Sequence, residues 1–419
     1  MNAVTRPEEP AQGGAGRIPQ KAERGSLDAR LLRRLLASVG NPPIEFVLAW
    51  TGERVSAPSI APRASVRIAD RSTLLGIVSD PQLRFGDAYT DGRVELDGDL
   101  IEFLKMIYRA SAGAGGESIA HRMAGLLHRR RRNTLAGSRD NIHRHYDLGN
   151  DFYSLWLGPT MAYTCAYYPR SDATLEAAQI AKMDHVCRKL RLTANDSVVE
   201  AGCGWGSLAL HMARHYGARV RAFNISREQI AYARGKAREL GLEKRVEFIE
   251  DDYRNITGSH DVFVSVGMLE HVGRENYHEL GRVVRAALGA EGRGLIHSIG
   301  RNRPAPLHPW IERRIFPGAY APSLGEMMQI FEPFRLSVLD VENIRLHYAR
   351  TLRHWLERYE RAVDAVRSKF DESLVRMWRM YLAGSAAAFE TGTLQLFQVL
   401  FTTDENNQIP LTRGYMYPT

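Results

Sequence analysis

The fold is decided by residues 196–217, which read DSVVEAGCGWGSLALHMARHYG. The first part, DSVVEAG, predicts a buried strand that runs directly into a glycine-rich turn. The last part, SLALHMARHYG, has apolar residues at helical spacing and ends at a glycine, which is typical of a helix with its C-terminal cap. A strand, a glycine turn and a helix in direct succession are typical of a ligand-binding α/β sheet.

The same alternation continues downstream of the turn. Strands are predicted at 218–226, 245–252, 260–267 and 292–300, and helices at 227–240 and 277–289. Repeated β-α-β units imply a parallel sheet with helices on both faces, so we expect an α/β core. After residue 349 apolar residues recur at intervals of three and four, which predicts that the rest of the chain is helical.

The region upstream of the core has a different pattern. Residues 1–26 are rich in small and charged residues and predict a disordered tail. A helical pattern at 27–39 and another at 99–109 enclose strand-like runs such as IEFVLAW, SVRIAD, TLLGIV and RFGDAYTDGRVEL. We therefore expect a small α+β domain at 27–110. A linker with a basic segment follows at 111–145, then the catalytic domain at 146–402 and a C-terminal tail at 403–419.

The charge of the chain is concentrated in one place. Lys and Arg number 56 against 48 Asp and Glu, a net charge of +8, and seven Arg and one Asp between His121 and His145 account for +6 of it. Apolar residues, among them Leu126 and Leu127, are interleaved with Arg129 to Arg132. A basic amphipathic segment suits docking on anionic lipid headgroups, and a solvated or RNA-touching helix is the alternative.

Composition excludes several classes of protein. Hydrophobic residues make up 44% of the chain, without the run of about 18 apolar residues that a membrane span needs. The N-terminus has no apolar core, so we expect no secretory signal. Cys165, Cys187 and Cys203 are too few and too scattered for a zinc site or a disulfide framework, and Cys187 fits a helix core. We expect no metal and a cytoplasmic location.

The glycine turn itself indicates the ligand. It reads Glu200-Ala201-Gly202-Cys203-Gly204-Trp205-Gly206, and the glycines let a ligand approach the backbone. A dinucleotide site has G-x-G-x-x-G for a pyrophosphate. Here the order is G-x-G-x-G after an acid, and an acid suits the cationic amine of S-adenosylmethionine (SAM). SAM is therefore favoured over a dinucleotide, and over a turn that serves only tight packing.

Polar residues at the ends of the next two strands extend the candidate SAM site. The second strand ends at Asn224, where a ribose-binding group is expected. Ser226 to Gln229 resembles a helix capping box, so capping alone is an equal alternative for Gln229. The third strand ends in Asp252 and Tyr253, where an acid can accept a hydrogen bond from the adenine amine, and a solvated loop is the alternative.

Several motifs in fixed order resemble the cyclopropane-fatty-acid synthase family. They are HYDLGNDFYSLWL, YTCAYY, EAGCGWGSLA, NISREQ, SVGMLEHVG, HSIG and WLERY, between about 143 and 401. This family includes bacterial phospholipid enzymes and mycolic acid cyclopropane synthases. The resemblance implies a Rossmann-like SAM-dependent methyltransferase core. The N-terminal region, notably RFGDAYTDGRVELDGDL, resembles the smaller lipid-binding domain of the phospholipid-acting members.

The resemblance also implies a reaction. A methyl group passes from SAM to the double bond of an unsaturated phospholipid acyl chain, and the resulting carbocation loses a proton to close a cyclopropane ring. The site has to exclude water and place a weak base near the methyl. The family implies bound bicarbonate as that base, with ligands carried over onto Cys165, Glu270, His297, the backbone of Ile299, and Tyr348.

The residues alone leave some of these roles open. On the residues alone Cys165 reads rather as an inert buried thiol and His297 rather as a satisfied histidine within an apolar strand, so the resemblance carries both roles; Tyr348 lies in a loosely matched segment. Glu270 follows a strand at the edge where α/β ligands bind. An anion beside a carboxylate requires that one of them keep a proton, so we expect a raised pKa at Glu270.

By the same resemblance, contacts with SAM fall on seven residues. These are Tyr163, Thr164, Gly202, Gly204, Asn224, Gln229 and Asp252. Glu200 and Gly206, from the turn, and Tyr253 complete the candidate SAM site. Two positions depart from the family: Glu200-Ala201 stands where Asp and an apolar residue are usual, and Ser385 stands where some relatives have a second cysteine.

Other functions remain as alternatives. The closest is a related fatty acyl C-methyltransferase that ends with a methylated alkene or a methyl branch, because its SAM and base motifs look alike. A nucleic-acid methyltransferase is distant: residues 41–44, Asn-Pro-Pro-Ile, mimic an adenine-methylation motif but lack the aromatic residue that stacks a flipped base. A non-enzymatic lipid-binding module does not explain the glycine turn. The expected partners are an anionic membrane surface and a second copy of the chain, without nucleic acid.

Overall fold

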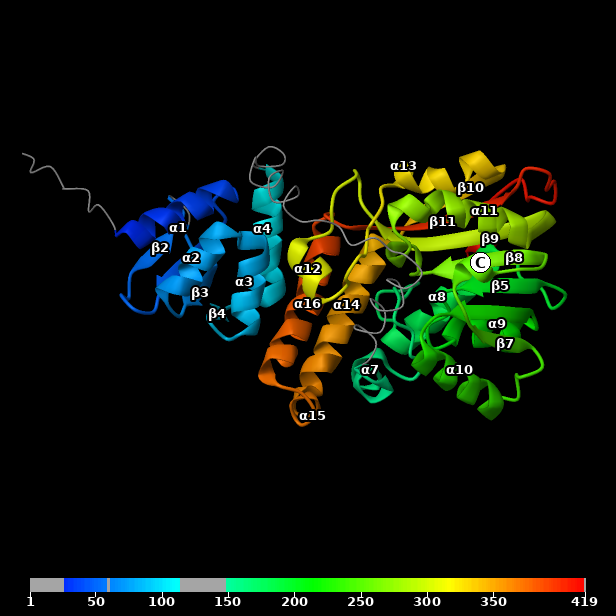
Figure 1. The fold of residues 1–419 in the computed structure, drawn as a ribbon, viewed down its shortest axis with the longest axis horizontal. Coiled ribbons are helices and arrows are strands. Elements are labelled where there is room, and N and C mark those ends of the chain that lie inside the picture. Colours follow the sequence, from blue (N-terminus) through cyan, green and yellow to red (C-terminus); the bar gives the residue numbers. More distant parts are fainter. Residues whose placement is uncertain (1–25, 59–60, 114–147, 418–419) are drawn as a thin grey trace, which may run out of the picture.

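The computed structural model describes residues 26–58, 61–113 and 148–417. Nearly all of the tail expected at 1–26 lies outside these residues, as does the basic segment from 114 onward. The described chain forms a small N-terminal unit, at the left of Figure 1, and a larger unit built on a seven-stranded sheet. None of its helices is both long and apolar enough to cross a membrane.

The N-terminal unit is a four-stranded sheet with helices, which agrees with the expected α+β class. Its elements are α1 (Leu27–Ser38), β1 (Ile44–Leu48), β2 (Arg54–Ser56), β3 (Ala64–Ile68), α2 (Arg71–Ser79), α3 (Pro81–Thr90), β4 (Val94–Asp97) and α4 (Leu100–Gly113). The strand order is β2-β1-β3-β4, with β1 and β3 parallel and the other pairs antiparallel. Side chains of β1 alternate between buried and half-buried, as expected for a sheet with one covered face.

Two of the strands predicted here are wrong. TLLGIV lies in α2, and RFGDAYT lies in α3, so only the end of that second run, β4, is a strand. Helix caps explain both differences. The Asp70 side chain accepts a hydrogen bond from the backbone of Thr73, and Asp80 caps α3 ahead of Pro81 at its first position. A capping aspartate followed by proline is a helix start signal that outweighs the short β-branched runs.

The larger unit contains the predicted α/β core. Its strands are β5 (Ser197–Ala201), β6 (Arg219–Asn224), β7 (Val246–Glu250), β8 (His260–Val266), β9 (Leu288–Gly300), β10 (Leu336–Asn343) and β11 (Gln395–Thr403), in the order β10-β11-β9-β8-β5-β6-β7. Its α-helices are α7 (Asn150–Leu157), α8 (Leu175–Lys189), α9 (Ser207–Tyr216), α10 (Arg227–Glu239), α11 (Tyr277–Ala287), α12 (Pro309–Arg314), α13 (Leu324–Met327), α14 (Arg345–Arg361), α15 (Val363–Arg367) and α16 (Glu372–Glu390). Short 3-10 helices are η1 (Tyr253–Asn255), η2 (Leu269–His271), η3 (Arg274–Asn276), η4 (Met328–Ile330), η5 (Glu332–Phe334) and η6 (Gly414–Met416).

The sheet is parallel only over five of its strands. β7, β6, β5, β8 and β9 run parallel, whereas β11 pairs antiparallel with both β9 and β10. The prediction of an all-parallel sheet is therefore wrong at the edge formed by β10 and β11. The prediction that the chain is helical throughout after residue 349 is also wrong, because β11 follows α16. All nine residues of β11 are buried. A fully buried strand has no alternation, so periodicity does not separate it from a buried helix.

The C-terminal segment after β11 belongs to the larger unit. Met416 is fully buried in the cluster that contains Val186 and Cys187 of α8. The Arg188 side chain on α8 donates to the Met416 carbonyl at 3.2 Å. The segment expected as a tail therefore covers one end of the sheet core.

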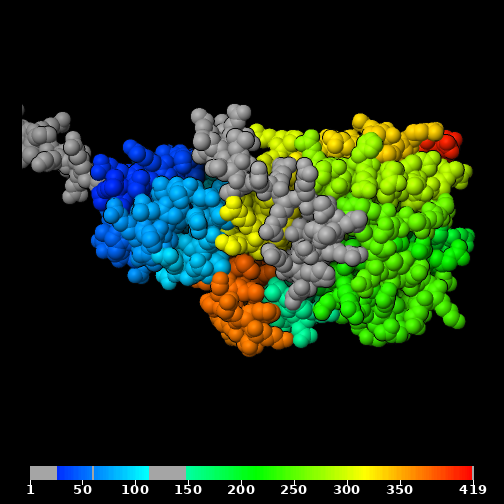
Figure 2. Space-filling view, in the orientation of Figure 1, coloured from blue at the N-terminus to red at the C-terminus, as the bar shows by residue number. Residues whose placement is uncertain are grey.

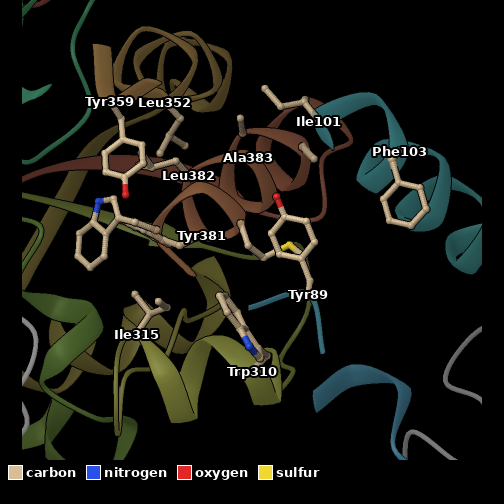
Figure 3. Close-up of a cluster of buried hydrophobic side chains, with 14 of the residues drawn as sticks. Tyr89, Ile101, Phe103, Trp310, Ile315, Leu352, Tyr359, Tyr381, Leu382 and Ala383 are labelled. Carbon is tan, nitrogen blue, oxygen red and sulfur yellow. The ribbon is translucent and has the colours of Figure 1, made fainter. Parts of the chain in front are cut away.

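Helices α14 and α16 and the segment around α12 join the two units. In Figure 3, Tyr89 and Phe103 of the N-terminal unit lie in the same buried cluster as Trp310 of α12 and Tyr381 of α16. Figure 2 shows the segment around α12, in yellow, filling the space next to the N-terminal unit. Polar contacts reinforce this packing, for example Arg314 to Asp87 at 2.9 Å. Residues of both units line one cavity beside this contact, which is described below.

Candidate functional site

The glycine turn lies between β5 and α9, as predicted. Gly202, Gly204 and Gly206 all have positive φ, at 82°, 54° and 85°. A Cβ on Gly206 would lie 2.7 Å from the Phe248 ring, so close packing alone requires this glycine. A Cβ on Gly204 would meet nothing within 4 Å, so the backbone there is open to a ligand. Packing therefore accounts for Gly206, and the open space at Gly204 leaves room for the ligand that the sequence predicts.

Glu200 and Asn224 lie beside this turn. Glu200 is buried at the end of β5, and its Oε2 has no hydrogen-bond partner among the described residues. Burial raises the pKa of Glu200 to about 8, opposed by the charge of Lys182. Asn224 Nδ2 donates to the Gly204 carbonyl at 3.3 Å and to Gln229 Oε1 at 2.7 Å. The structure therefore brings Asn224 and Gln229 to the glycine turn.

Gln229 and Asp252 each have an additional local role. The Ser226 hydroxyl accepts from the Gln229 backbone at 3.4 Å, so this half of the expected capping box forms while the Gln229 side chain turns to Asn224. Asp252 is buried and pairs with Arg254 at 3.1 Å, so the alternative of a solvated acid is wrong. Tyr253 is also buried, with the Arg254 guanidinium 4.9 Å from its ring centroid.

Tyr163 and Thr164 lie on the other side of the site, in the segment before α8. Two buried side chains of α8 fix this segment. Gln179 Nε2 donates to the Thr164 carbonyl at 2.9 Å, and Lys182 Nζ donates to the Thr164 hydroxyl at 3.0 Å. The Tyr163 hydroxyl lies 2.7 Å from that of Tyr381. Sequence reasoning missed Gln179 and Lys182, although two polar residues three apart on a buried helix face are a detectable signal.

The five residues expected to hold bicarbonate all line one cavity. Cys165, Glu270, His297, Ile299 and Tyr348 come from five positions spread over 184 residues of sequence, and each lines this cavity wall at some point. Tyr163, Thr164 and Ser385 line this cavity as well. The described residues contain no group of three or more His, Cys, Asp and Glu placed to bind a metal.

Glu270 is the ionisable centre of this wall. Its Oε1 accepts the backbone N–H of Ile299 at 2.6 Å, and its buried Oε2 has no hydrogen-bond partner in the described chain. Burial raises the pKa of Glu270 to about 7. The direction agrees with the sequence expectation, but the cause is loss of water rather than a neighbouring anion. The Ile299 N–H is already used by Glu270, so an anion there has to share this donor.

His297 and Cys165 are both neutral in this environment. Burial lowers the pKa of His297 to about 3 and raises the pKa of the Cys165 thiol. His297 Nδ1 lies 3.1 Å from Nε2 of Gln398, because β9 and β11 pair these two residues directly. Gln398 was missed because β11 was not predicted. Since Gln398 occupies Nδ1, the Nε2 of His297 is the ring atom left for a ligand.

The cavity continues far beyond these residues. Its volume is about 1560 Å³, and its far wall comes from α1, α3 and α4 of the N-terminal unit. Leu35, Phe85, Phe103, Leu104 and Ile107 line that wall. Ligand sites for compact small molecules are typically 300–1,000 Å³. A larger cavity that apolar side chains of both units line, and that Glu270 and His297 border, suits a long apolar ligand.

Comparison with known families agrees with this geometry. Residues 133–399 match the family described as mycolic acid cyclopropane synthetase, and residues 31–116 match a domain of unknown function, DUF7884. The chain belongs to the mycolic acid cyclopropane synthetase family. It is a SAM-dependent methyltransferase with the Rossmann-like fold of that family.

Two curated relatives span most of the chain. A probable fatty acid methyltransferase of Pseudomonas putida is 36% identical over 88% of this chain and 95% of its own length. The cyclopropane-fatty-acyl-phospholipid synthase of Escherichia coli K12 is 35% identical over 84% of this chain and 91% of its own length. Among solved structures, the mycolic acid cyclopropane synthase CmaA1 complexed with SAH and CTAB is 28% identical, with a TM-score of 0.60 over 63% of this chain and 98% of that one.

Within this cyclopropane synthetase fold, the candidate residues form two groups at one edge of the sheet. The candidate SAM group lies at the carboxyl ends of β5, β6 and β7. The other group includes Glu270, which follows β8, and His297 and Ile299, which lie near the end of β9, and it borders the cavity. Gly202 links them, since a Cβ there would lie 2.7 Å from Met268, two residues before Glu270. The predicted sites are therefore adjacent, as a transfer reaction between two ligands requires.

Proposed function

We propose that the chain transfers a methylene group from SAM to the double bond of an unsaturated phospholipid acyl chain, forming a cyclopropane ring. The observation that carries this proposal is the shared cavity, with Glu270 and His297 at one end and apolar side chains of the N-terminal unit at the other. The E. coli relative, named cyclopropane-fatty-acyl-phospholipid synthase, supports the same substrate class.

The residues around the glycine turn fit SAM. When bound, SAM supplies an electrophilic sulfonium methyl group. The open backbone at Gly204 permits close approach, and Glu200 Oε2 is a buried acceptor that lacks a partner in the described chain. Asn224 lies at the end of β6, where the ribose binds in such folds, with Gln229 of α10 hydrogen-bonded to it, and Asp252 follows the end of β7. We assign SAM binding to these residues together with Tyr163, Thr164, Gly202, Gly206 and Tyr253.

The group around Glu270 fits a bicarbonate ion. When bound, bicarbonate supplies a weak base. With its pKa near 7, Glu270 can keep a proton and donate it from the unpartnered Oε2 to an anion. Neutral His297 presents Nε2 to the same space, and Tyr348 and the Cys165 thiol border it. We assign these four residues and the Ile299 backbone to holding the anion.

The apolar part of the cavity serves the proposed reaction by excluding water. A carbocation formed from an alkene is trapped by water if water reaches it. Leu352, Leu396 and Phe389 line the catalytic unit's side of the cavity, and the N-terminal unit closes the opposite side. The chain's contribution to ring closure is thus a dry space with one proton acceptor site.

Fatty acid analysis after incubation with SAM and vesicles of an unsaturated anionic phospholipid tests this function. The expected result is a mass gain of one CH₂ per modified chain and an upfield cyclopropane signal in proton NMR. Glu270→Gln should retain SAM binding but lose the product. Bicarbonate-depleted buffer should reduce turnover of the wild-type protein. If no acyl chain gains CH₂, the proposed function is wrong.

A fatty acyl C-methyltransferase is the second candidate, because the P. putida relative is named a probable fatty acid methyltransferase. The two functions share SAM, an alkene and a carbocation, and differ in how the cation loses its charge. The same NMR spectrum separates them: an olefinic or branched-methyl signal in place of the cyclopropane signal selects the second candidate.

We also propose that the protein is cytoplasmic, binds the membrane surface peripherally and forms a homodimer. Arg129 to Arg132 carry the membrane contact in this proposal, and they lie outside the described residues. Replacing all four with Gln should weaken vesicle binding, and raising the salt concentration should reduce the difference between variant and wild type. Light scattering during gel filtration measures the oligomeric state, and a monomer at micromolar concentration would refute the dimer.

A further inference from the structure

Arg301 lies in the cavity but has no part in the assignments above. It follows Gly300, the last residue of β9, and lines the same cavity as Glu270 and His297. Residues two apart on a strand face the same side. His297, Ile299 and Arg301 therefore point to one face, and all three line the cavity. The strand itself places the arginine at a fixed separation from the candidate catalytic wall.

The Arg301 side chain has no ionic partner in the described chain. None of the ion pairs found among these residues includes it, and its Nε is buried without a hydrogen-bond partner. The nearest phenols are those of Tyr108, on α4, and Tyr320, and burial lowers the pKa of the guanidinium. Glu326 does not neutralise it, because this carboxylate accepts from the Tyr320 hydroxyl at 2.8 Å and pairs with Arg274.

An unpaired, partly buried arginine is costly to maintain. Natural proteins pair buried charges or use them to bind a charged ligand. The planar guanidinium presents several N–H donors that match the oxygens of a phosphate group. The cavity that Arg301 lines has apolar side chains, among them Phe103, Ile107 and Trp310, and further charged residues, among them Arg303 and Glu312. The ligand that fits is an anionic group attached to an apolar body.

We propose that Arg301 binds the phosphodiester of the substrate phospholipid while the acyl chain extends along the cavity toward Glu270. This inference rests on the proposed function and adds the residue that selects a phospholipid over other acyl compounds. Arg301 follows His297 by four residues, roughly 13 Å at about 3.3 Å per residue. One leaflet of a bilayer's hydrocarbon core spans about 15 Å. A headgroup at Arg301 therefore places a double bond from the interior of the chain, not its first carbons, near His297.

The N-terminal unit completes this site. Tyr108 comes from α4, across the cavity from β9, so the phosphate would be held where the two units meet. This arrangement gives the small unit a direct role in substrate selection besides closing the cavity. Its apolar side chains contact the acyl chain, and its α4 borders the headgroup.

A binding measurement tests the inference without relying on turnover. Calorimetry with soluble dihexanoylphosphatidylglycerol should give an affinity for Arg301→Gln that is about 10- to 100-fold weaker than wild type, the range for a hydrogen bond to a charged group. Arg214→Gln is the control, since Arg214 is exposed on α9 and does not line the cavity; it should change the affinity less than about threefold. Arg301→Lys should restore part of the loss, because it keeps the charge but not the planar fork.

Kinetics with two lipids that have the same acyl chains but differ in the phosphate headgroup measure whether Arg301 determines specificity for a phospholipid. Wild type should prefer dioleoylphosphatidylglycerol to dioleoylglycerol in mixed micelles. Arg301→Gln should raise KM for the phospholipid, leave kcat within about twofold, and lose the preference. If the variant keeps the wild-type preference, or if Arg214→Gln loses that preference as well, the inference is wrong. Tighter binding of oleate or of inorganic phosphate than of the phospholipid would also refute it, because the anion would then come from another source.

The two proposals fail separately. If wild type methylates neither lipid but binds the short phospholipid through Arg301, the proposed function is wrong and the phosphate site stands. If wild type methylates the phospholipid and Arg301→Gln does so with unchanged KM, only the phosphate site is wrong.

Melting temperatures check folding: Arg301→Met should be at least as stable as wild type, because it removes an uncompensated charge. A large loss of stability would instead indicate a structural role and refute the inference.

Discussion

Replacing Glu270 with glutamine should stabilise the folded protein at alkaline pH. The carboxyl is buried at the cavity wall, and burial raises its pKa from 4.5 to about 7. Above pH 7 the folded protein therefore keeps a charge in a place that disfavours it. Glutamine has the same shape, and its Oε1 can still accept the Ile299 N–H that now donates to Glu270. The substitution removes the cost of the charge and keeps the hydrogen bond.

The magnitude follows from the pKa. A folded pKa above the unfolded value means that the carboxyl destabilises the fold once the pH exceeds about 4.5, and that the full cost is reached above pH 7. Each pKa unit corresponds to about 1.4 kcal/mol, so the cost is about 3 kcal/mol at pH 8.5 and below about 1 kcal/mol at pH 5. With an unfolding entropy of about 2.1 cal/mol/K per residue, roughly 400 residues give a gain of about 4 °C in Tm at the higher pH.

Thermal unfolding of wild type and Glu270→Gln at pH 5 and pH 8.5 measures this gain. The difference in Tm should be small at pH 5 and should grow between pH 5 and pH 8. Glu243→Gln is the control, because Glu243 is exposed, and it should show no such growth. A variant that is less stable than wild type at both pH values would refute the reasoning, since the carboxylate would then be stabilising as an anion. Loss of activity together with a gain in stability is the expected pattern for a functional acid.

Three further predictions follow from packing and charge. Gly206→Ala should lower stability more than Gly204→Ala, because both place a side chain at a positive φ but just the first places a Cβ against an aromatic ring. Gly204→Ala should in addition weaken SAH binding, measured by calorimetry. SAH binding should tighten as the pH rises from 6 to 8. Glu200, with a pKa of about 8, has to release a proton before it can pair with the ligand's amine, and Glu200→Gln should abolish this trend. Gly86→Ala would bring a Cβ within 2.5 Å of the Trp310 ring, and it should loosen the joint between the units, seen as faster limited proteolysis.

The core could be predicted from the sequence because its signals are local. The glycine turn, the strands on either side of it and the helix cap at Ser226 are each specified by residues that lie close together in the sequence. The failures have physical causes too. β11 is buried on both faces, so its apolar run carries no period, and α2 and α3 depend on capping aspartates that outweigh β-branched content. Propensity decides a segment only where capping and tertiary contacts do not.

The candidate site could be predicted in part, for a similar reason. Residues with a motif around them, such as Glu270 and His297, were found, and the structure places them on one wall of the cavity. Lys182 and Gln398 were missed, because their role is to hold other side chains and depends on which elements become neighbours. Two polar residues three apart on the buried face of α8 indicate a supporting role in the sequence, but the three-dimensional arrangement is needed to show which groups they hold.

Buried polar atoms without partners are a guide to ligands only when their charge is considered. Most buried polar groups in proteins are hydrogen-bonded, so each exception calls for a reason. In the described chain the indole nitrogens of Trp156 and Trp355 are such exceptions, but they are neutral, lie within an aromatic cluster and cost little. Some ionisable exceptions have an ionic partner, as Lys189 and Asp340 do. Glu200, Glu270 and Arg301 are ionisable and form no ion pair in the described chain, so the same burial costs far more for them. Each of these three borders the glycine turn or the cavity, so SAM, the anion and the phospholipid together would satisfy all of them.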